Sequence, residues 1–275
     1  MYQFGFIGVG NMGGALAAAV CKNCEPSAVC LSNRTREKAE ALAAKLGCRT
    51  GTNGEAADSD YIFLGVKPQT LPELFSELTP VLKRNFESGR RCILVTMAAG
   101  VTMEAVEKMS GVPSPVIRIM PNTPLAVGEG MILYTANAAV TEGELSRFTA
   151  ALSGTGRLDR LEEAEIDAAS VLSGCGPAFA FLFADALSAA GEELGLSSEK
   201  ARLYAEQMLL GSSRLALESG KDLKELTRAV CSPGGTTIEG VKRFEEEGLN
   251  AIVSHAVNAS YRRTLELAGK EPDGV

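Results

Sequence analysis

The sequence feature that most constrains the fold is the segment Gly8–Gly13, which reads G-V-G-N-M-G. The preceding apolar run, Phe4–Gly8, predicts a β-strand, and the residues from Asn11 to Cys21 predict a helix. A strand, a G-x-G-x-x-G loop and a helix in this order are typical of a dinucleotide-binding site, although glycines at this spacing also occur in purely structural turns.

Each glycine of this loop has a separate physical reason to be there. Gly8 permits the tight turn, Gly10 lets the backbone approach the pyrophosphate, and Gly13 allows the helix to pack closely on the strand. The phosphates then lie at the helix N-terminus, where unpaired N–H groups and the helix dipole favour negative charge. We therefore expect cofactor contacts from Ile7, Gly8, Gly10, Asn11, Met12 and Gly13.

The first half of the chain alternates strand-like and helix-like segments, which predicts an α/β fold with a doubly wound sheet. Further strands are expected at residues 29–32, 61–66, 92–96, 116–120 and 131–134, with a helix at 36–46. From about Glu162 strands disappear, and helices are expected at 166–172, 177–194, 198–218, 223–230, 237–246 and 249–268. The chain has 275 residues, enough for two domains, so we expect a Rossmann dinucleotide-binding domain at 1–158 and an all-α domain at 159–275.

The end of the second expected strand indicates which dinucleotide is bound. An NAD site carries an Asp or Glu there, about 20 residues past the glycines, to accept from the ribose hydroxyls. This chain instead has Asn33 and Arg34, with no acid before Glu37. Amide and guanidinium groups suit a 2′-phosphate, so we expect NADPH, with NADH as the second choice. The alternative is that Arg34 is a solvated residue at a helix start.

Two more strand ends point to the same site, because open α/β sheets bind ligands at the carboxyl ends of their strands. Val66, Lys67 and Pro68 follow one strand, and we expect Lys67 to meet phosphate or ribose unless it is an ordinary surface lysine. The small residues of Met97-Ala98-Ala99-Gly100 follow another and would let a nicotinamide ring lie against the backbone. We count Val66, Lys67, Pro68, Met97, Ala98 and Ala99 among the expected cofactor contacts.

Two glycine-rich loops lie in the helical half, at Ser173–Phe179 and Cys231–Thr237. The second precedes an expected helix and combines hydroxyls with free backbone N–H groups, which suits a carboxylate ligand. The alternative is that Ser232 and the threonines only cap the helix.

With these motifs the chain resembles the pyrroline-5-carboxylate reductase family over nearly its whole length, most specifically at Ser232–Thr237. The resemblance implies a Rossmann domain, a helical dimerisation domain and NAD(P)H-dependent reduction of 1-pyrroline-5-carboxylate to L-proline, the last step of proline biosynthesis. It implies that Thr237 hydrogen-bonds the substrate's ring nitrogen, that Glu163 lies near substrate, and that Asn53 contacts the ribose. It also implies substrate contacts from Ser232, Gly234, Gly235 and Thr236, and a nicotinamide pocket at Ala98 and Ala99.

The sequence departs from the family pattern at a few positions around these loops. Asp222-Leu223 replaces a His-Pro pair, Arg228 replaces an acid, and Cys175 and Cys231 replace Ser or Thr. These departures concern the interface loops rather than the chemistry.

The segment at 177–187 is apolar around most of its circumference, so it needs cover on all sides. We expect a partner subunit to supply it, giving a homodimer or a larger homo-oligomer. A β-hydroxyacid dehydrogenase is one alternative, but it needs a helical lysine where this chain has Phe179, Phe181 and Phe183. The two remaining alternatives are another imine reductase and a non-catalytic NADP-binding dimeric scaffold.

Composition limits the remaining choices. The net charge of −7 argues against a nucleic-acid partner, and no apolar run is expected to reach the length of a membrane span. Seven cysteines without framework spacing suggest free thiols in a reducing compartment, which favours the cytoplasm. Cys21 and Cys24 form a C-x-x-C at a helix end, without the second pair or histidines a zinc site needs, so we expect no metal. The single histidine, His255, is expected to be structural.

Overall fold

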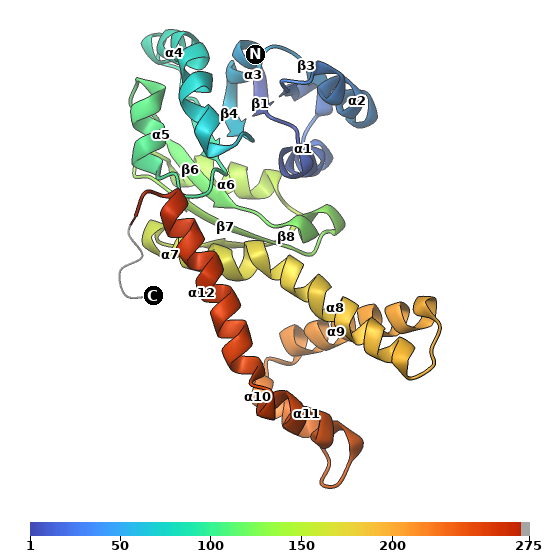
Figure 1. The fold of residues 1–275 in the computed structure, drawn as a ribbon. Coiled ribbons are helices and arrows are strands. Elements are labelled where there is room, and N and C mark those ends of the chain that lie inside the picture. The colour runs from blue at the N-terminus through green and yellow to red at the C-terminus, as the bar shows by residue number, and fades with distance from the viewer. Residues whose placement is uncertain (271–275) are drawn as a thin grey trace. The chain divides into compact units, whose positions relative to one another are not determined.

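The structure, a computed structural model, describes residues 1–270 (Figure 1). The chain divides into two compact units. The first contains Met1–Gly174 together with residues 261–270, and the second contains Cys175–Ser260. The boundary at 158 expected from the sequence stays a prediction about the extent of the nucleotide-binding part.

One eight-stranded sheet forms the centre of the first unit, in the order β3-β2-β1-β4-β5-β6-β7-β8. Strand β7 runs antiparallel to β6, and every other neighbouring pair is parallel. The order 3-2-1-4-5-6 of the first six strands is that of a doubly wound Rossmann sheet. The strands are β1 (Tyr2–Ile7), β2 (Val29–Ser32), β3 (Arg49–Thr50), β4 (Ser59–Leu64), β5 (Ile93–Thr96), β6 (Val116–Met120), β7 (Gly130–Ala136) and β8 (Gly156–Arg160).

Helices cover both faces of this sheet, as the apolar runs of its central strands require. Helices α1, α2 and α6 pack on one face, where Phe4, Phe6 and Phe63 are buried, and α3, α4 and α5 pack on the other, around Ile62 and Leu64. The α-helices of this unit are α1 (Asn11–Asn23), α2 (Arg36–Leu46), α3 (Asn53–Ala57), α4 (Leu71–Glu87), α5 (Met103–Ser110), α6 (Glu142–Ala151) and α7 (Glu163–Ser170). Short 3₁₀ turns lie at η1 (Pro26–Ala28), η2 (Pro68–Thr70) and η3 (Thr123–Val127), and a π-turn, η4, at Val171–Cys175.

The second unit is entirely helical. It contains α8 (Gly176–Glu193), α9 (Ser198–Ser219), α10 (Leu223–Val230), α11 (Thr236–Glu246) and the first part of α12 (Leu249–Leu267), whose last turns belong to the first unit. Helices α8 and α9 pack against each other, yet α8 has no buried residue. Large apolar side chains of this unit are exposed, including Phe181, Leu182, Leu203, Leu210, Leu215, Leu217, Ile252 and Val253.

The predicted fold class is confirmed: a Rossmann sheet followed by a helical region. Two strands were not predicted. β3 is only two residues long, and β8, with the sequence G-R-L-D-R, is an exposed, charged edge strand that extends to Arg160. Such a strand forms because its backbone pairs with β7, not because its side chains enter a core.

The helix expected at 166–172 is longer than predicted. It begins at Glu163, because the Glu162 and Glu165 side chains form a capping box, and it continues through η4 into α8. By length and composition alone, this stretch of 31 residues, Glu163–Glu193, is apolar enough to cross a membrane, so the expectation that no segment has these properties is wrong. A helix that is covered by a second subunit requires the same composition.

Candidate active site

The three glycines after β1 occupy different environments. Gly8 has a φ of +95°, and a Cβ there would lie 2.4 Å from the Gly65 carbonyl oxygen. A Cβ on Gly13 would lie 2.1 Å from the Gly8 carbonyl oxygen. Gly10, in contrast, has no neighbouring atom within 4 Å of a built Cβ. Gly8 therefore allows close contact with the segment after β4, Gly13 allows α1 to pack closely on the end of β1, and Gly10 leaves open space at the backbone.

This open space lies at the N-terminus of α1. No side chain caps the helix at Gly10, and its first turn, which begins with Asn11, Met12 and Gly13, contains no acid. Free N–H groups without a competing carboxylate bind anions such as a pyrophosphate. The loop thus has the shape and polarity that a dinucleotide requires.

Asn33, at the end of β2, is tied to the glycine loop. Its side-chain oxygen accepts a hydrogen bond from the Val9 N–H at 3.1 Å, and its amide nitrogen donates to the Thr35 carbonyl at 3.0 Å. One amide N–H of Asn33 remains for an anion. Arg34 is exposed and makes no hydrogen bond or ion pair within residues 1–270, whereas Arg36 pairs with Glu40 at 2.8 Å.

Asn53 connects two other elements at this edge of the sheet. Its side-chain oxygen accepts from the Ser32 hydroxyl at 2.7 Å, and its amide donates to Glu77 Oε2 at 2.8 Å. Neither Ser32 nor Glu77 was singled out from the sequence. Ser32 could have been found as the last residue of a strand next to the cofactor loop, but nothing local marks Glu77 on α4.

The ends of β4 and β5 lie at the same carboxyl edge. Val66 is half-buried, Lys67 is exposed, and Pro68 begins η2. In the segment after β5, Met97 and Ala99 are half-buried and Ala98 is fully buried, with its N–H bonded to the Thr96 hydroxyl at 3.3 Å. The structure therefore places all the expected cofactor residues at strand ends or at the start of α1 or α3.

Glu163, expected near substrate, is partly exposed and belongs to an ionic cluster in the first unit whose centre, Arg118 and Asp167, is buried. Its Oε1 accepts from the Met103 N–H at the start of α5 at 2.7 Å and lies 3.7 Å from Arg118 Nη1. Arg118 is only 1% exposed and is ion-paired with Asp167, which is also 3.3 Å from Lys270 Nζ. The sequence did not reveal this cluster, because its members come from β6, from α7 and from Lys270 just after α12.

The loop before α11, in the second unit, holds the remaining expected substrate residues. Gly234 has a φ of +72°, and the Gly235 N–H bonds to the Ser232 carbonyl at 3.0 Å, which closes a tight turn. Gly235 is the N-cap of α11, with no side-chain cap. Thr236 and Thr237 are exposed, and within the described chain their hydroxyls make no hydrogen bond. The threonine hydroxyls therefore do not act as the cap.

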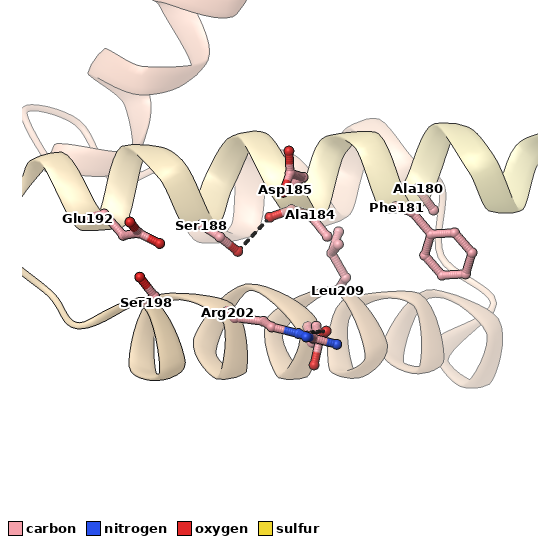
Figure 2. Close-up of a pocket in the computed structure, with 10 residues that line it drawn as sticks. Ala180, Phe181, Ala184, Asp185, Ser188, Glu192, Ser198, Arg202 and Leu209 are labelled. Atoms are coloured by element: carbon pink, nitrogen blue, oxygen red, sulfur yellow. Dashed lines mark hydrogen bonds and ion pairs between the residues drawn. The ribbon is translucent and has the colours of Figure 1, made fainter.

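A groove of about 600 Å³ runs between α8 and α9 (Figure 2). Phe181, Ala184 and Leu209 line it, together with polar side chains such as Arg202, which is paired with Glu206 at 2.7 Å. None of the expected substrate residues lines this groove. It forms part of the exposed apolar surface of α8 and α9.

The seven cysteines are scattered over both units. All seven are free, and residues 1–270 contain no group of three or more His, Cys, Asp or Glu side chains placed to hold a metal ion. The hydrogen bond between Cys21 and Cys48 raises the pKa of the Cys21 thiol and lowers that of Cys48, and burial raises the pKa of Cys24. Raised thiol pKa values are typical of unreactive, packed cysteines. His255 is exposed on α12.

Comparison with known proteins identifies two matching family models. The one described as pyrroline-5-carboxylate reductase dimerisation matches residues 163–267, and the one described as NADP oxidoreductase, coenzyme F420-dependent, matches residues 3–87. The first therefore covers α7 to α12, including the exposed faces of α8 and α9.

Similar proteins of known name cover nearly the whole chain. The chain is 37% identical over 270 residues to a pyrroline-5-carboxylate reductase of Pseudomonas aeruginosa, covering 97% of both chains. A solved structure of a pyrroline-5-carboxylate reductase from Coxiella burnetii is 33% identical, with a TM-score of 0.87 over 97% of this chain and 98% of that one. A Plasmodium falciparum pyrroline carboxylate reductase, solved with NADP bound, is 26% identical, with a TM-score of 0.85 over the same shares of the two chains.

Proposed function

The chain belongs to the pyrroline-5-carboxylate reductase family, and we propose that it reduces 1-pyrroline-5-carboxylate to L-proline with NADPH. The observation that carries the proposal is the match over nearly the whole chain, which includes both the cofactor edge of the sheet and the Ser232–Thr237 loop. The enzyme is an oxidoreductase that acts on a C=N bond.

The cofactor residues proposed from the sequence are supported by their place at the carboxyl edge of the sheet. Gly10 and the start of α1 would hold the pyrophosphate, since a Cβ at Gly10 meets nothing and the helix end is uncapped. Arg34 and the free N–H of Asn33 would bind the 2′-phosphate, with Asn53 and Lys67 facing ribose and phosphate. The backbone of Met97, Ala98 and Ala99 would line the nicotinamide ring.

NADPH supplies the hydride that the imine carbon receives, and one proton must reach the ring nitrogen to complete the amine. A protonated imine is already electrophilic, so the protein has mainly to orient it and exclude other geometries. Thr237 would hydrogen-bond the ring nitrogen, because its hydroxyl has no partner within the described residues and α11 begins beside it.

The substrate carboxylate fits the start of α11. Thr236 and Thr237 offer backbone N–H groups that no side chain caps, whereas the Gly235 N–H already donates to the Ser232 carbonyl and so closes the turn that precedes them. Glu163 would contribute its second carboxylate oxygen near substrate, since only Oε1 bonds to Met103. These assignments follow the family signature residue by residue.

Residues 163–267 make up the family's dimerisation domain, and the chain forms a homodimer through it. The exposed apolar side chains of α8 and α9 support this assembly. Association of dimers into a larger homo-oligomer is a further proposal, which light scattering would decide. Seven free thiols support a reducing compartment, and we place the enzyme in the cytoplasm.

The test is NADPH oxidation, followed at 340 nm, with 1-pyrroline-5-carboxylate as the substrate. We expect turnover and formation of L-proline, identified by chromatography. Turnover of a 3-hydroxy acid with NADP⁺ instead would favour a β-hydroxyacid dehydrogenase, and turnover of other cyclic imines without pyrroline-5-carboxylate would favour a different imine reductase. NADPH binding without any turnover would favour a non-catalytic scaffold.

A further inference from the structure

The last turn of α12 packs directly on the segment that follows β5. Gly100 closes this segment with a φ of +74°, and a Cβ there would lie 2.8 Å from the Ala268 nitrogen and 2.9 Å from the Leu267 carbonyl carbon. Both neighbours are backbone atoms, so they cannot move aside as a flexible side chain would. The absence of a side chain at Gly100 is therefore what allows the last turn of α12 to lie against Met97–Gly100.

The burial of one side chain and one ion pair also hold the end of α12 in this place. Leu265 is buried, and Lys270 Nζ lies 3.3 Å from Asp167 Oδ2 on α7. Asp167 is 5% exposed and is fixed in turn by Arg118, which is 1% exposed. Residues 265–270 thus contact both the loop after β5 and the buried Arg118–Asp167 ion pair.

We propose that residues 265–270 act as a positioning clamp for the Met97–Gly100 loop, and through it for the nicotinamide ring. This inference rests on the proposed function, which places the nicotinamide against Met97, Ala98 and Ala99. Hydride transfer depends steeply on the distance and angle between donor and acceptor, and a misplacement of about 1 Å lowers the rate about a hundredfold. None of the clamp residues needs to touch cofactor or substrate, so their role is positioning.

The substitution Gly100→Ala tests the clamp, with Gly89→Ala as a matched control. Gly89 has nearly the same φ, +76°, but no atom within 4 Å of a built Cβ, so both variants carry the same backbone strain and only one collides with α12. In Gly100→Ala we expect kcat to fall at least about tenfold, with KM for the imine within about twofold. The isotope effect on kcat with NADPH deuterated at the transferred position should rise, because hydride transfer becomes rate-limiting.

Lys270→Ala provides a second variant that leaves the packing of Gly100 unchanged. Lys270 is half-exposed, so its loss should not prevent folding, and we expect kcat to fall about threefold with a raised isotope effect. Equal kcat values and isotope effects in wild type, Gly100→Ala and Lys270→Ala would overturn the proposal. So would equal losses in Gly89→Ala and Gly100→Ala.

NADPH binding without substrate separates this proposal from the proposed function. From the fluorescence of the reduced nicotinamide, we expect the Kd of NADPH to rise about fivefold in Gly100→Ala and to stay within about twofold in Gly89→Ala. If the wild type does not reduce pyrroline-5-carboxylate, the proposed function fails while the binding measurement still decides the clamp. An unchanged Kd in Gly100→Ala under those conditions would overturn the clamp as well.

Discussion

Thr237 is the residue on which the proposed chemistry depends most directly. Thr237→Ala should lower kcat/KM about ten- to a hundredfold, the loss expected when one uncharged hydrogen bond to the ring nitrogen is left unmade. Thr237→Ser should keep most activity, because the hydroxyl is retained. Since Gly235 rather than Thr237 is the N-cap of α11, neither variant should lose much stability. Steady-state kinetics and a thermal melt measure the two effects.

Thr149→Ala, at a half-buried threonine of α6 outside the matched dimerisation domain, is the control for Thr237 and should leave the kinetics unchanged. If Thr237→Ala keeps full turnover, the hydroxyl does not contact the imine and the placement of the substrate is wrong.

Arg34 should determine the preference for NADPH over NADH. Arg34→Glu replaces a guanidinium with a carboxylate, which carries the same sign of charge as the 2′-phosphate and repels it. We therefore expect NADPH binding to weaken about tenfold or more, while NADH binding changes about twofold at most. Lys45→Glu, which makes the same charge change at the end of α2, should change neither. Equal losses for the two cofactors in Arg34→Glu would contradict the 2′-phosphate assignment.

At the scale of elements, Glu144 joins α6 to the start of β5. Its carboxylate accepts from both the Arg91 Nε at 2.8 Å and the Arg91 Nη2 at 3.0 Å, and it closes a capping box with Thr141. The hydrogen bond from Arg91 is the main reason that the pKa of Glu144 falls from 4.5 to about 2. A depressed pKa means that folding stabilises the ionised form. The ionised Glu144 carboxylate therefore contributes fully to the free energy of unfolding above about pH 4.5, and this contribution is lost as the pH falls through about 2.

Glu144→Gln should accordingly lower the free energy of unfolding at pH 7 by on the order of 2 kcal/mol, and the difference from wild type should shrink to nothing near pH 2. Denaturant unfolding at several pH values measures this. Glu142→Gln, an exposed acid in the first turn of the same helix, should change stability little at any pH. If Glu144→Gln lowers the free energy of unfolding by the same amount at every pH, the effect comes from packing and not from the charge of Glu144.

At the scale of the whole molecule, the exposed apolar face of α8 should be the dimer surface. Phe181 is 68% exposed within one chain and lines the groove between α8 and α9. Phe181→Glu would bury an unpaired carboxylate in the dimer, so we expect the dimer dissociation constant to rise at least about a hundredfold. Light scattering should then show a mass near 28.8 kDa, that of one chain.

Phe86→Glu, on α4 and outside the dimerisation domain, is the matched control, since Phe86 is also half-exposed. It should leave the dimer intact. A Phe181→Glu variant that remains dimeric would place the subunit contact on another face of residues 163–267.

The sequence by itself determined the parts of the protein that depend on local order. The glycine loop, the Rossmann alternation, the helical second half and the Ser232–Thr237 turn could all be predicted, because a few consecutive residues specify each of them. Tertiary structure decided the rest. The charged edge strand β8 exists because β7 offers it a backbone to pair with. Asn33, which we expect to meet the phosphate, also accepts a hydrogen bond from the Val9 N–H, because folding brings the two residues together.

The ionic cluster around Arg118 also depends on tertiary structure. Arg118, Asp167 and Lys270 are far apart in the chain, and nothing next to each of them predicts burial of a charge. Burying a guanidinium is unfavourable unless carboxylates meet it, so the cluster can exist only once β6, α7 and the end of α12 have come together. The sequence could therefore predict the glycine loop and the Ser232–Thr237 turn, but only the packing of distant segments could decide what holds the last turn of α12 against Met97–Gly100.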